Sequence, residues 1–106
     1  MALKVLFRPQ AEADLLALYR YIAEASGLVI AGNYIDRIEV ACMSLATFPN
    51  RGTKRDNLAP GLRTIAFERR VTIAYRVLKA RVEIVTIAYA GRDFESDLRG
   101  DEKKKR

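Results

Sequence analysis

The chain has 106 residues, of which half are apolar and 30% are charged, and this is the composition of one globular domain. Its single cysteine, Cys42, cannot form an intramolecular disulfide, and without any histidine in the chain it cannot complete a zinc site. The first residues do not form a signal peptide, and no stretch approaches the roughly 20 apolar residues of a membrane span. We therefore expect a cytoplasmic protein that makes no membrane contact.

Positive charge is concentrated in the second half of the chain. Residues 1–49 carry a net charge of −1, residues 50–98 carry +4 and residues 99–106 carry +3, within a formal total of +6. Such an imbalance suits an acidic protein partner or a nucleic acid. An ordinary soluble surface with a basic tail would have the same signature.

The opening of the chain predicts a strand and then an amphipathic helix. Apolar side chains at positions 3, 5 and 7 share one face of a short strand over residues 3–7. Pro9 suits the first turn of a helix, and apolar residues at positions 11, 15, 18 and 22 form a helical stripe. We expect Gly27 to end this helix.

A second helix is predicted from Val29 to about Thr47. Apolar residues at positions 31, 35, 38, 42 and 45 recur in steps of four and three, and the short link at residues 26–27 favours an antiparallel helical hairpin. Pro49 and Gly52 then end the helix, and residues 53–60 read as a polar loop.

Beyond Gly61 the apolar pattern alternates, which predicts three strands over residues 62–67, 71–77 and 82–89. The last is apolar on both faces in its middle, as a central strand would be. The order is therefore β-α-α-β-β-β, which indicates an α+β domain over residues 1–98 with the hairpin packed on a small antiparallel sheet. Residues 91–98 form a short C-terminal segment, and the charged residues 99–106 predict a disordered tail.

Several short motifs occur in a specific order along this pattern. They are Ala11-x-x-Asp14-Leu15-x-x-Leu18-x-x-Tyr21-Ile22, Leu45-x-x-Phe48-Pro49-x-x-Gly52, Pro60-Gly61-Leu62-Arg63, Ile73-Ala74-Tyr75-Arg76-Val77, Val82-Glu83-Ile84 and Ile87-Ala88-Tyr89-x-x-Arg92-Asp93. Taken together, over residues 3–98, they resemble the RelE/ParE toxin superfamily of type II toxin–antitoxin systems, on its ParE side.

The resemblance implies one of two activities on the same fold. RelE-type members are ribosome-dependent endonucleases that cut messenger RNA, whereas ParE-type members inhibit DNA gyrase, block replication and stabilise plasmids. In both branches the resemblance implies a cognate antitoxin that binds the toxin in a hetero-oligomer, by laying a helix into an apolar groove or adding a strand to a sheet edge. We expect the toxin-binding segment of that antitoxin to be acidic.

The residues match the ribonuclease branch only in part. Cleavage of RNA needs a proton-transfer group and cations close to the phosphate. Arg63 and Arg92 match two of the cation positions, and Tyr89 is a substitute for the proton-transfer group. Three other expected positions carry residues without that chemistry, namely Ile65, Thr72 and Leu98.

The sequence therefore favours a toxin that inhibits gyrase by binding, without catalysis and without a cofactor. The alternatives are a RelE-type endonuclease acting through Arg63, Tyr89 and Arg92, and a non-toxic module that only binds its antitoxin.

Two sets of surface residues are candidates for binding. The candidates for the target are basic and lie in the sheet region or just after it: Arg63, Arg69, Arg70, Arg76 and Arg92. Alternatively, these arginines are the ordinary surface charge of strand edges and turns.

The candidates for the antitoxin widen the apolar faces of the two helices: Leu16, Tyr19, Val29, Ile30, Val40 and Met43. Alternatively, these apolar residues complete the core. We also expect Asp14 to hold a basic group of the sheet, and Cys42 to be a small core residue.

Overall fold

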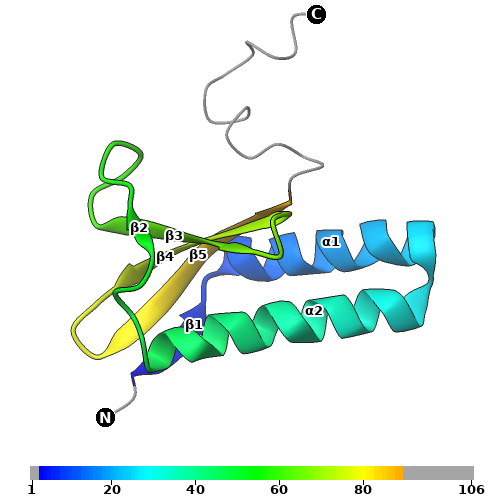
Figure 1. Cartoon of the computed structure of the whole chain (residues 1–106), viewed down its shortest axis with the longest axis horizontal. Helices are drawn as coiled ribbons and strands as arrows, with labels where there is room; N and C mark the ends of the chain where they lie inside the picture. Colours follow the sequence, from blue (N-terminus) through cyan, green and yellow to red (C-terminus); the bar gives the residue numbers. More distant parts are fainter. Residues whose placement is uncertain (1–2, 90–106) are drawn as a thin grey trace, which may run out of the picture.

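The computed structural model describes residues 3–89 of the chain, and in it a helical hairpin packs against a five-stranded sheet (Figure 1). The elements, in chain order, are β1 (Lys4–Phe7), α1 (Pro9–Ser26), α2 (Leu28–Met43), a 3₁₀ turn (Ser44–Ala46), β2 (Thr53–Lys54), β3 (Leu62–Phe67), β4 (Val71–Val77) and β5 (Arg81–Tyr89). The predicted α+β class and the predicted order of elements are confirmed. The predicted segment at 91–98 and the tail at 99–106 lie outside the described residues.

The ends of the helices follow the residues that the sequence marks. Pro9 occupies the first turn of α1, where its missing N–H has no helical partner to lose. Gly27 separates the helices with φ of +100°, a conformation that a residue with a Cβ adopts only with strain. The second helix is shorter than expected, because after Met43 the backbone tightens into the 3₁₀ turn.

The sheet has the order β1-β5-β4-β3-β2. Strands β2 to β5 pair antiparallel with their neighbours, but β1 runs parallel to β5, so the sheet is mixed and the antiparallel sheet that we expected is wrong at this edge. Alternation of side chains identifies a strand but carries no information on the direction of its neighbour. Strand β2 is a second difference, since it lies in the segment 53–60 that reads as a loop.

Strand β5 is central, as predicted, and it contains a bulge. Val82, Ile84 and Ile87 are all buried, although the step from 84 to 87 breaks the alternation of a regular strand. The register shifts at this point, because Tyr75 pairs with Ile84 and Ala74 pairs with Thr86. The one extra residue in β5 restores the phase, so that all three side chains lie on the same face of the sheet.

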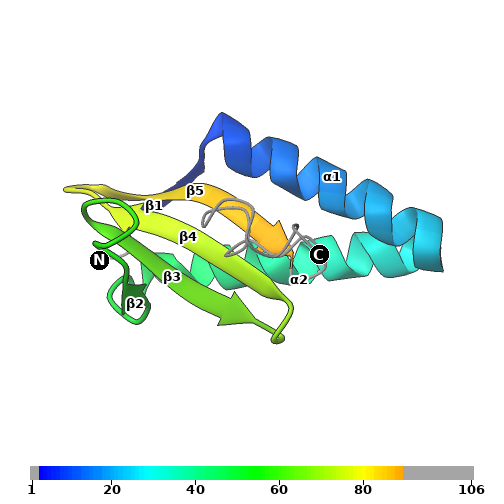
Figure 2. The ribbon, with the colours of Figure 1, turned by 90° about the horizontal axis from the view of Figure 1, so that it is seen from above.

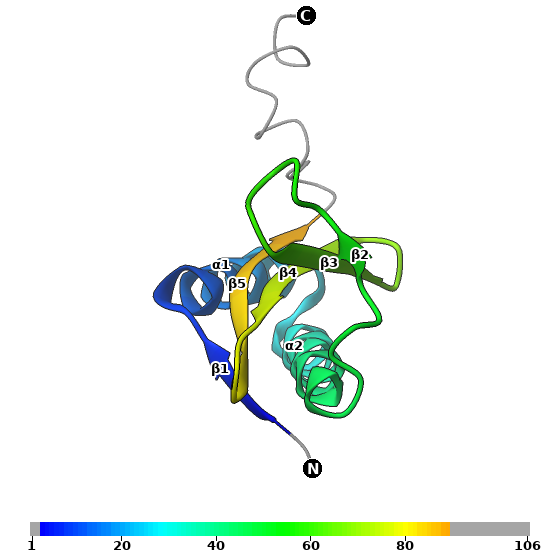
Figure 3. The ribbon, with the colours of Figure 1, turned by 90° about the vertical axis from the view of Figure 1, so that its left-hand side faces the viewer.

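The core lies between that face and the helices. Figures 2 and 3 show α2 beneath the sheet and α1 alongside β5, beyond the point where β1 ends. Buried side chains come from α1, from α2 with the 3₁₀ turn, and from the two central strands: Ala11, Leu15, Leu18, Ile38, Cys42, Leu45, Val71, Ile73, Tyr75, Val82, Ile84 and Ile87. Cys42 is fully buried, as predicted, and burial raises the pKa of its thiol to about 12.

Candidate functional site

The loop that follows the helices is fixed to the sheet by two side chains. The buried Tyr75 hydroxyl donates to the Pro49 carbonyl at 2.8 Å and accepts from the Gly52 amide at 3.0 Å. The Arg63 guanidinium donates to the carbonyls of Asn50 and Gly52, both at 3.0 Å. Residues 49–52 are therefore held from β3 and β4 together.

Two of the arginines predicted to bind the target thus have structural contacts. Arg63 pairs with Tyr75 across the strands, so both side chains lie on the helix-facing side of the sheet, and the Arg63 guanidinium contacts backbone carbonyls there. Arg76 extends toward the Pro60 carbonyl through a weaker contact of 3.4 Å. Arg92 lies outside the described residues.

The other two predicted arginines lie at the β3–β4 turn. Glu68 and Arg69 have φ of 50° and 66°, and this left-handed backbone reverses the chain tightly between the strands. Arg69 and Arg70 are exposed. The Glu68 carboxylate accepts two bonds from the Arg37 guanidinium, at 3.0 and 3.1 Å, which fastens the turn to α2. The hydrogen bonds from Arg37 lower the pKa of the Glu68 carboxyl below its ordinary value.

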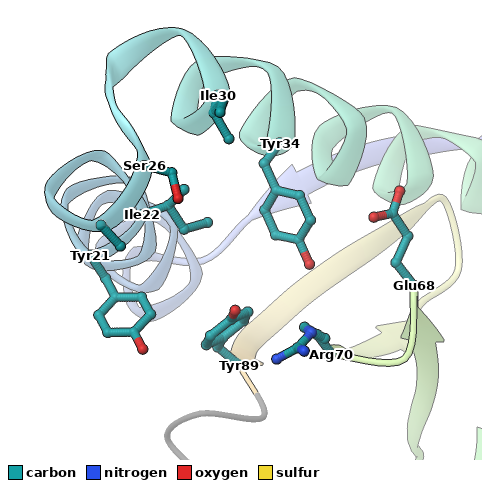
Figure 4. A pocket seen from close by; sticks show the side chains of 9 residues that line it. Tyr21, Ile22, Ser26, Ile30, Tyr34, Glu68, Arg70 and Tyr89 are labelled. Atoms are coloured by element: carbon teal, nitrogen blue, oxygen red, sulfur yellow. The ribbon is translucent and has the colours of Figure 1, made fainter.

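A cavity of about 340 Å³ opens between this turn, the linked ends of the two helices and the end of β5 (Figure 4). Its walls combine three tyrosines with small and apolar residues, one acidic residue and one basic residue: Tyr21, Ile22, Ala25, Ser26, Ile30, Tyr34, Glu68, Arg70 and Tyr89. The sequence identified Ile30, Arg70 and Tyr89 as separate candidates. It did not bring them together, because they lie far apart in the chain.

Aromatic contacts define the shape of this cavity. The rings of Tyr21 and Tyr89 lie 5.6 Å apart, and the ring of Tyr34 meets Phe67 edge-on at 5.8 Å. The Arg37 guanidinium lies 5.1 Å from the centre of the Tyr34 ring, a distance at which cation–π attraction is effective.

Tyr34 carries the one buried side-chain polar atom that has no hydrogen-bond partner within residues 3–89, its hydroxyl oxygen. Burial, followed by the negative charge of Glu68, raises the pKa of Tyr34 above its usual value, so the hydroxyl keeps its proton at neutral pH. No sequence pattern distinguishes Tyr34 as a functional residue, since a tyrosine in a helix is most often a packing residue.

The residues predicted to contact the antitoxin all reach the surface. Five are exposed and Tyr19 is half-buried, so the alternative that they complete the core is wrong for the exposed five. They do not form a single patch. Val29, Val40 and Met43 follow one stripe along α2, because eleven residues make about three helical turns. Ile30 instead lines the cavity, and Leu16 lies on α1. Their role as antitoxin contacts stays a prediction.

Asp14 has a structural role, although not with the basic group that we expected. Its carboxylate accepts from the Thr86 hydroxyl and, at 2.9 Å, from the backbone amide of Ile87. Strand β1 pairs with β5 only as far as Ile84, so Asp14 takes up an amide at the edge that β1 leaves open.

Glu83 of β5 forms ion pairs within its own strand and with Arg8, the residue that follows β1. The carboxylate of Glu83 lies 3.5 Å from the Arg8 guanidinium and 2.9 Å from that of Arg81. The hydrogen bond from Arg81, with further help from Arg8, lowers the pKa of the Glu83 carboxyl.

The part of the chain that the structure describes contains no membrane-spanning helix and no metal-binding cluster. Over residues 3–89, neither helix has the length and apolar character needed to cross a bilayer. No histidine, cysteine or acidic side chains in that range cluster in a way that would hold a metal ion.

The arrangement of a helical hairpin against a small mixed sheet is that of RelE/ParE toxins. The chain superposes with a TM-score of 0.74 and 26% identity on a structure of the chromosomal ParDE toxin–antitoxin system of P. aeruginosa, covering 83% of this chain and 96% of that one. It shares the fold of a chain in the RelBE2 toxin–antitoxin complex of Mycobacterium tuberculosis, with a TM-score of 0.57, 20% identity and coverage of 84% and 99%.

Sequence comparison is more specific than the fold. Residues 5–94 match the family described as ParE toxin of type II toxin–antitoxin system, parDE, and the chain therefore belongs to the ParE toxin family. Toxin ParE3 of Caulobacter vibrioides is 38% identical over 53 residues, which are 50% of this chain and 53% of the relative. The chain thus spans about half the length of this curated relative.

Proposed function

We propose that this ParE-family toxin acts in the cytoplasm by binding DNA gyrase and blocking replication, without catalysis and without a cofactor, and that a cognate antitoxin neutralises it. The family supports the coarse function, since the chain is a type II toxin. The preference for binding over RNA cleavage rests on the positions of two residues.

The observation that carries the proposal is the separation of Arg63 and Tyr89, the described members of the ribonuclease alternative. Arg63 pairs with Tyr75, and Tyr89 pairs with Val71, at the opposite end of β4. Four residues of a strand span about 13 Å, whereas groups that share one reacting phosphate must lie within hydrogen-bond reach of it.

The local contacts of both residues support the same conclusion. The Arg63 guanidinium contacts two backbone carbonyls, and the Tyr89 ring packs beside Tyr21. By contrast, Arg69 and Arg70 are exposed at the tip of a turn that their neighbour Glu68 fastens to α2. This turn is an exposed basic projection, and we propose it as part of the gyrase-binding surface.

The proposal of an antitoxin rests on exposed apolar surface and on the compared structures. Val29 is 76% exposed and Val40 is 68% exposed on the outer stripe of α2. Exposed apolar surface of this kind on a small domain is typical of a face that a partner covers. Both compared structures belong to toxin–antitoxin systems.

Expression of the chain without its antitoxin tests the proposal. We would follow the uptake of labelled thymidine and labelled methionine separately after induction, and measure supercoiling by purified gyrase with added toxin. We expect DNA synthesis to stop first while translation persists, and supercoiling to be inhibited. Arg69→Glu together with Arg70→Glu should relieve the inhibition, whereas Arg20→Glu on exposed α1 should not.

An early stop in translation with cleaved messenger RNA would instead favour the ribonuclease alternative. Unchanged growth of cells that contain the folded chain would favour a module that only binds its antitoxin.

A further inference from the structure

We propose that the tyrosine-lined cavity is the anchoring pocket for an acidic side chain of the antitoxin, held by the Arg70 guanidinium and the Tyr34 hydroxyl. This inference rests on the proposed neutralisation by an antitoxin and adds the site and the chemistry of the contact.

The unengaged groups are donors. Within residues 3–89 the Arg70 guanidinium has no ion pair or hydrogen bond, and it can only donate. The Tyr34 hydroxyl is buried without a partner, and leaving such a group unpaired is unfavourable. Figure 4 shows the Tyr34 hydroxyl and the Arg70 guanidinium directed into the same space, with Tyr89 on its other side. An acceptor in this space would meet the Arg70 guanidinium directly, and it would reach the buried Tyr34 hydroxyl once the side chains that cover that hydroxyl move.

Among the described residues that line the cavity, Glu68 is the acidic one, and its charge is compensated. Both carboxylate oxygens of Glu68 accept bonds from Arg37, whose guanidinium approaches from outside the cavity lining. The Glu68 carboxylate therefore does not neutralise Arg70 by a contact of its own. A planar carboxylate from a partner matches a free guanidinium through paired hydrogen bonds, which are stronger than those of neutral groups.

The walls and the size of the cavity indicate the kind of molecule that carries the carboxylate. Ile22, Ala25 and Ile30 supply apolar surface next to the tyrosine rings, which suits the methylene groups of a side chain. A volume of about 340 Å³ is at the lower end for ligand pockets and accommodates one side chain with some adjoining backbone. The cavity also borders the helical hairpin, whose outer stripe we propose as antitoxin-binding surface. A segment that covers the hairpin can therefore place an acidic residue in the cavity.

Two substitutions test the pocket with little risk to the fold. Tyr34→Phe removes only a hydroxyl that has no hydrogen-bond partner within residues 3–89, so the thermal midpoint of the variant should not fall. Arg70→Gln removes an exposed charge at a turn. Arg69→Gln is the matched control, because Arg69 is the adjacent exposed arginine and does not line the cavity.

The measurement is the affinity of each purified toxin variant for the cognate antitoxin by calorimetry. We expect Arg70→Gln to weaken binding about tenfold or more and Tyr34→Phe to weaken it about fivefold, as for loss of a hydrogen bond to a charged group. Arg69→Gln should stay within about twofold. Replacing the antitoxin's acidic residues one at a time by Gln or Asn should identify one whose loss has no further effect beside Arg70→Gln.

Each other outcome has a distinct meaning. If the wild-type chain does not bind the antitoxin, the proposed function fails and the inference fails with it. If the antitoxin binds but Tyr34→Phe and Arg70→Gln bind as tightly as wild type, only the inference is overturned. If Arg69→Gln lost as much affinity for the antitoxin as Arg70→Gln, the effect would come from the net charge of the turn, and the inference would be overturned as well. Binding of free glutamate or acetate in the cavity, without any effect of the variants on antitoxin affinity, would assign the pocket to a small acid instead.

Discussion

Tyr75 determines the position of the loop that follows the helices. Its ring is fully buried in the core, while its hydroxyl fixes the backbone at Pro49 and Gly52. A Cβ built on Gly52 would lie 2.6 Å from that hydroxyl and 2.9 Å from the Thr64 carbonyl. The close approach of this loop to β4 therefore requires glycine at position 52.

The first prediction contrasts two glycines. Gly52→Ala should lower the free energy of unfolding by about 1–3 kcal/mol, because the added methyl group must displace the Tyr75 hydroxyl or the strand. Gly32→Ala, in α2 with nothing within 4 Å of the added Cβ, should raise the same free energy by about 0.5–1 kcal/mol. Urea denaturation of both variants measures this. Equal effects of the two substitutions would contradict the close contact at Gly52.

The second prediction concerns the thiol of Cys42. Burial raises its pKa to about 12, so almost no thiolate is present at pH 8, and the side chain is not accessible to reagents. We expect no reaction with Ellman's reagent at pH 8 in the native protein, and one thiol per chain after addition of denaturant. A fast reaction of the native protein would show that α2 opens readily from the sheet.

Charge alone did not reveal what each arginine contacts. The sequence identified Arg63 and Arg76 as candidates because basic residues gather in the sheet region. The structure places the guanidinium of each beside backbone carbonyls of a loop, and such contacts depend on where the loop lies in space. Carbonyl acceptors exist at every residue, so no sequence pattern identifies the ones that an arginine meets.

At the scale of elements, α1 is attached to β5 at a site where the sheet would otherwise have an open edge. Strand β1 is short, and beyond its end Asp14 accepts the amide of Ile87 and the hydroxyl of Thr86. The motif position of Asp14 indicated a structural residue. The identity of its partners depended on the parallel pairing of β1, which determines how far the edge of β5 is covered.

The third prediction tests this attachment. Asp14→Ala leaves the Ile87 amide without its acceptor, and we expect the free energy of unfolding to fall by about 2 kcal/mol. Gln10→Ala is the control, because Gln10 contacts the same carboxylate only at the exposed end of α1 and its loss should cost little. Hydrogen exchange at the Ile87 amide should also become faster in Asp14→Ala than in the control.

The bulge in β5 is a further result at this scale. Apolar residues on both faces of the middle of β5 correctly predicted a central strand. The same apolar pattern also reflects the bulge, because the extra residue between Ile84 and Thr86 moves the buried side chains from even to odd positions along β5. Periodicity over so short a segment does not distinguish a strand buried on two faces from a strand with a bulge.

At the scale of the whole molecule, the exposed apolar surface lies mainly on the helical hairpin, and the basic turn projects from the sheet. Val29, Val40 and Met43 share the outer stripe of α2, and Arg69 and Arg70 lie at the β3–β4 turn. The two surfaces are presented by different elements, but Arg70 belongs to both proposed contacts, because it lies at the turn and also lines the cavity. The cavity is lined by residues of the helical hairpin and of the turn, although not by the outer stripe of α2.

The fourth prediction separates surface contacts from core contacts on the hairpin. A triple variant, Val29→Gln with Val40→Gln and Met43→Gln, should unfold at the wild-type temperature or slightly above it, because the three side chains are exposed and glutamine is a good helix former. Its affinity for the antitoxin should fall at least tenfold. Ala17→Gln, at an exposed position of α1, should leave both quantities unchanged. A large fall in thermal stability of the triple variant would mean that the stripe belongs to the core.

The sequence by itself determined the α+β class, the two helices, the main strands and the fully buried position of Cys42. These features follow from side-chain periodicity and from proline and glycine, which act within a few neighbouring residues. Only the tertiary structure decided the parallel pairing of β1, the loop contacts of Arg63 and the cavity where Tyr34, Arg70 and Tyr89 meet. The physical reason is that these contacts join segments distant in the chain, and their energies depend on distances and directions in space that local patterns do not encode.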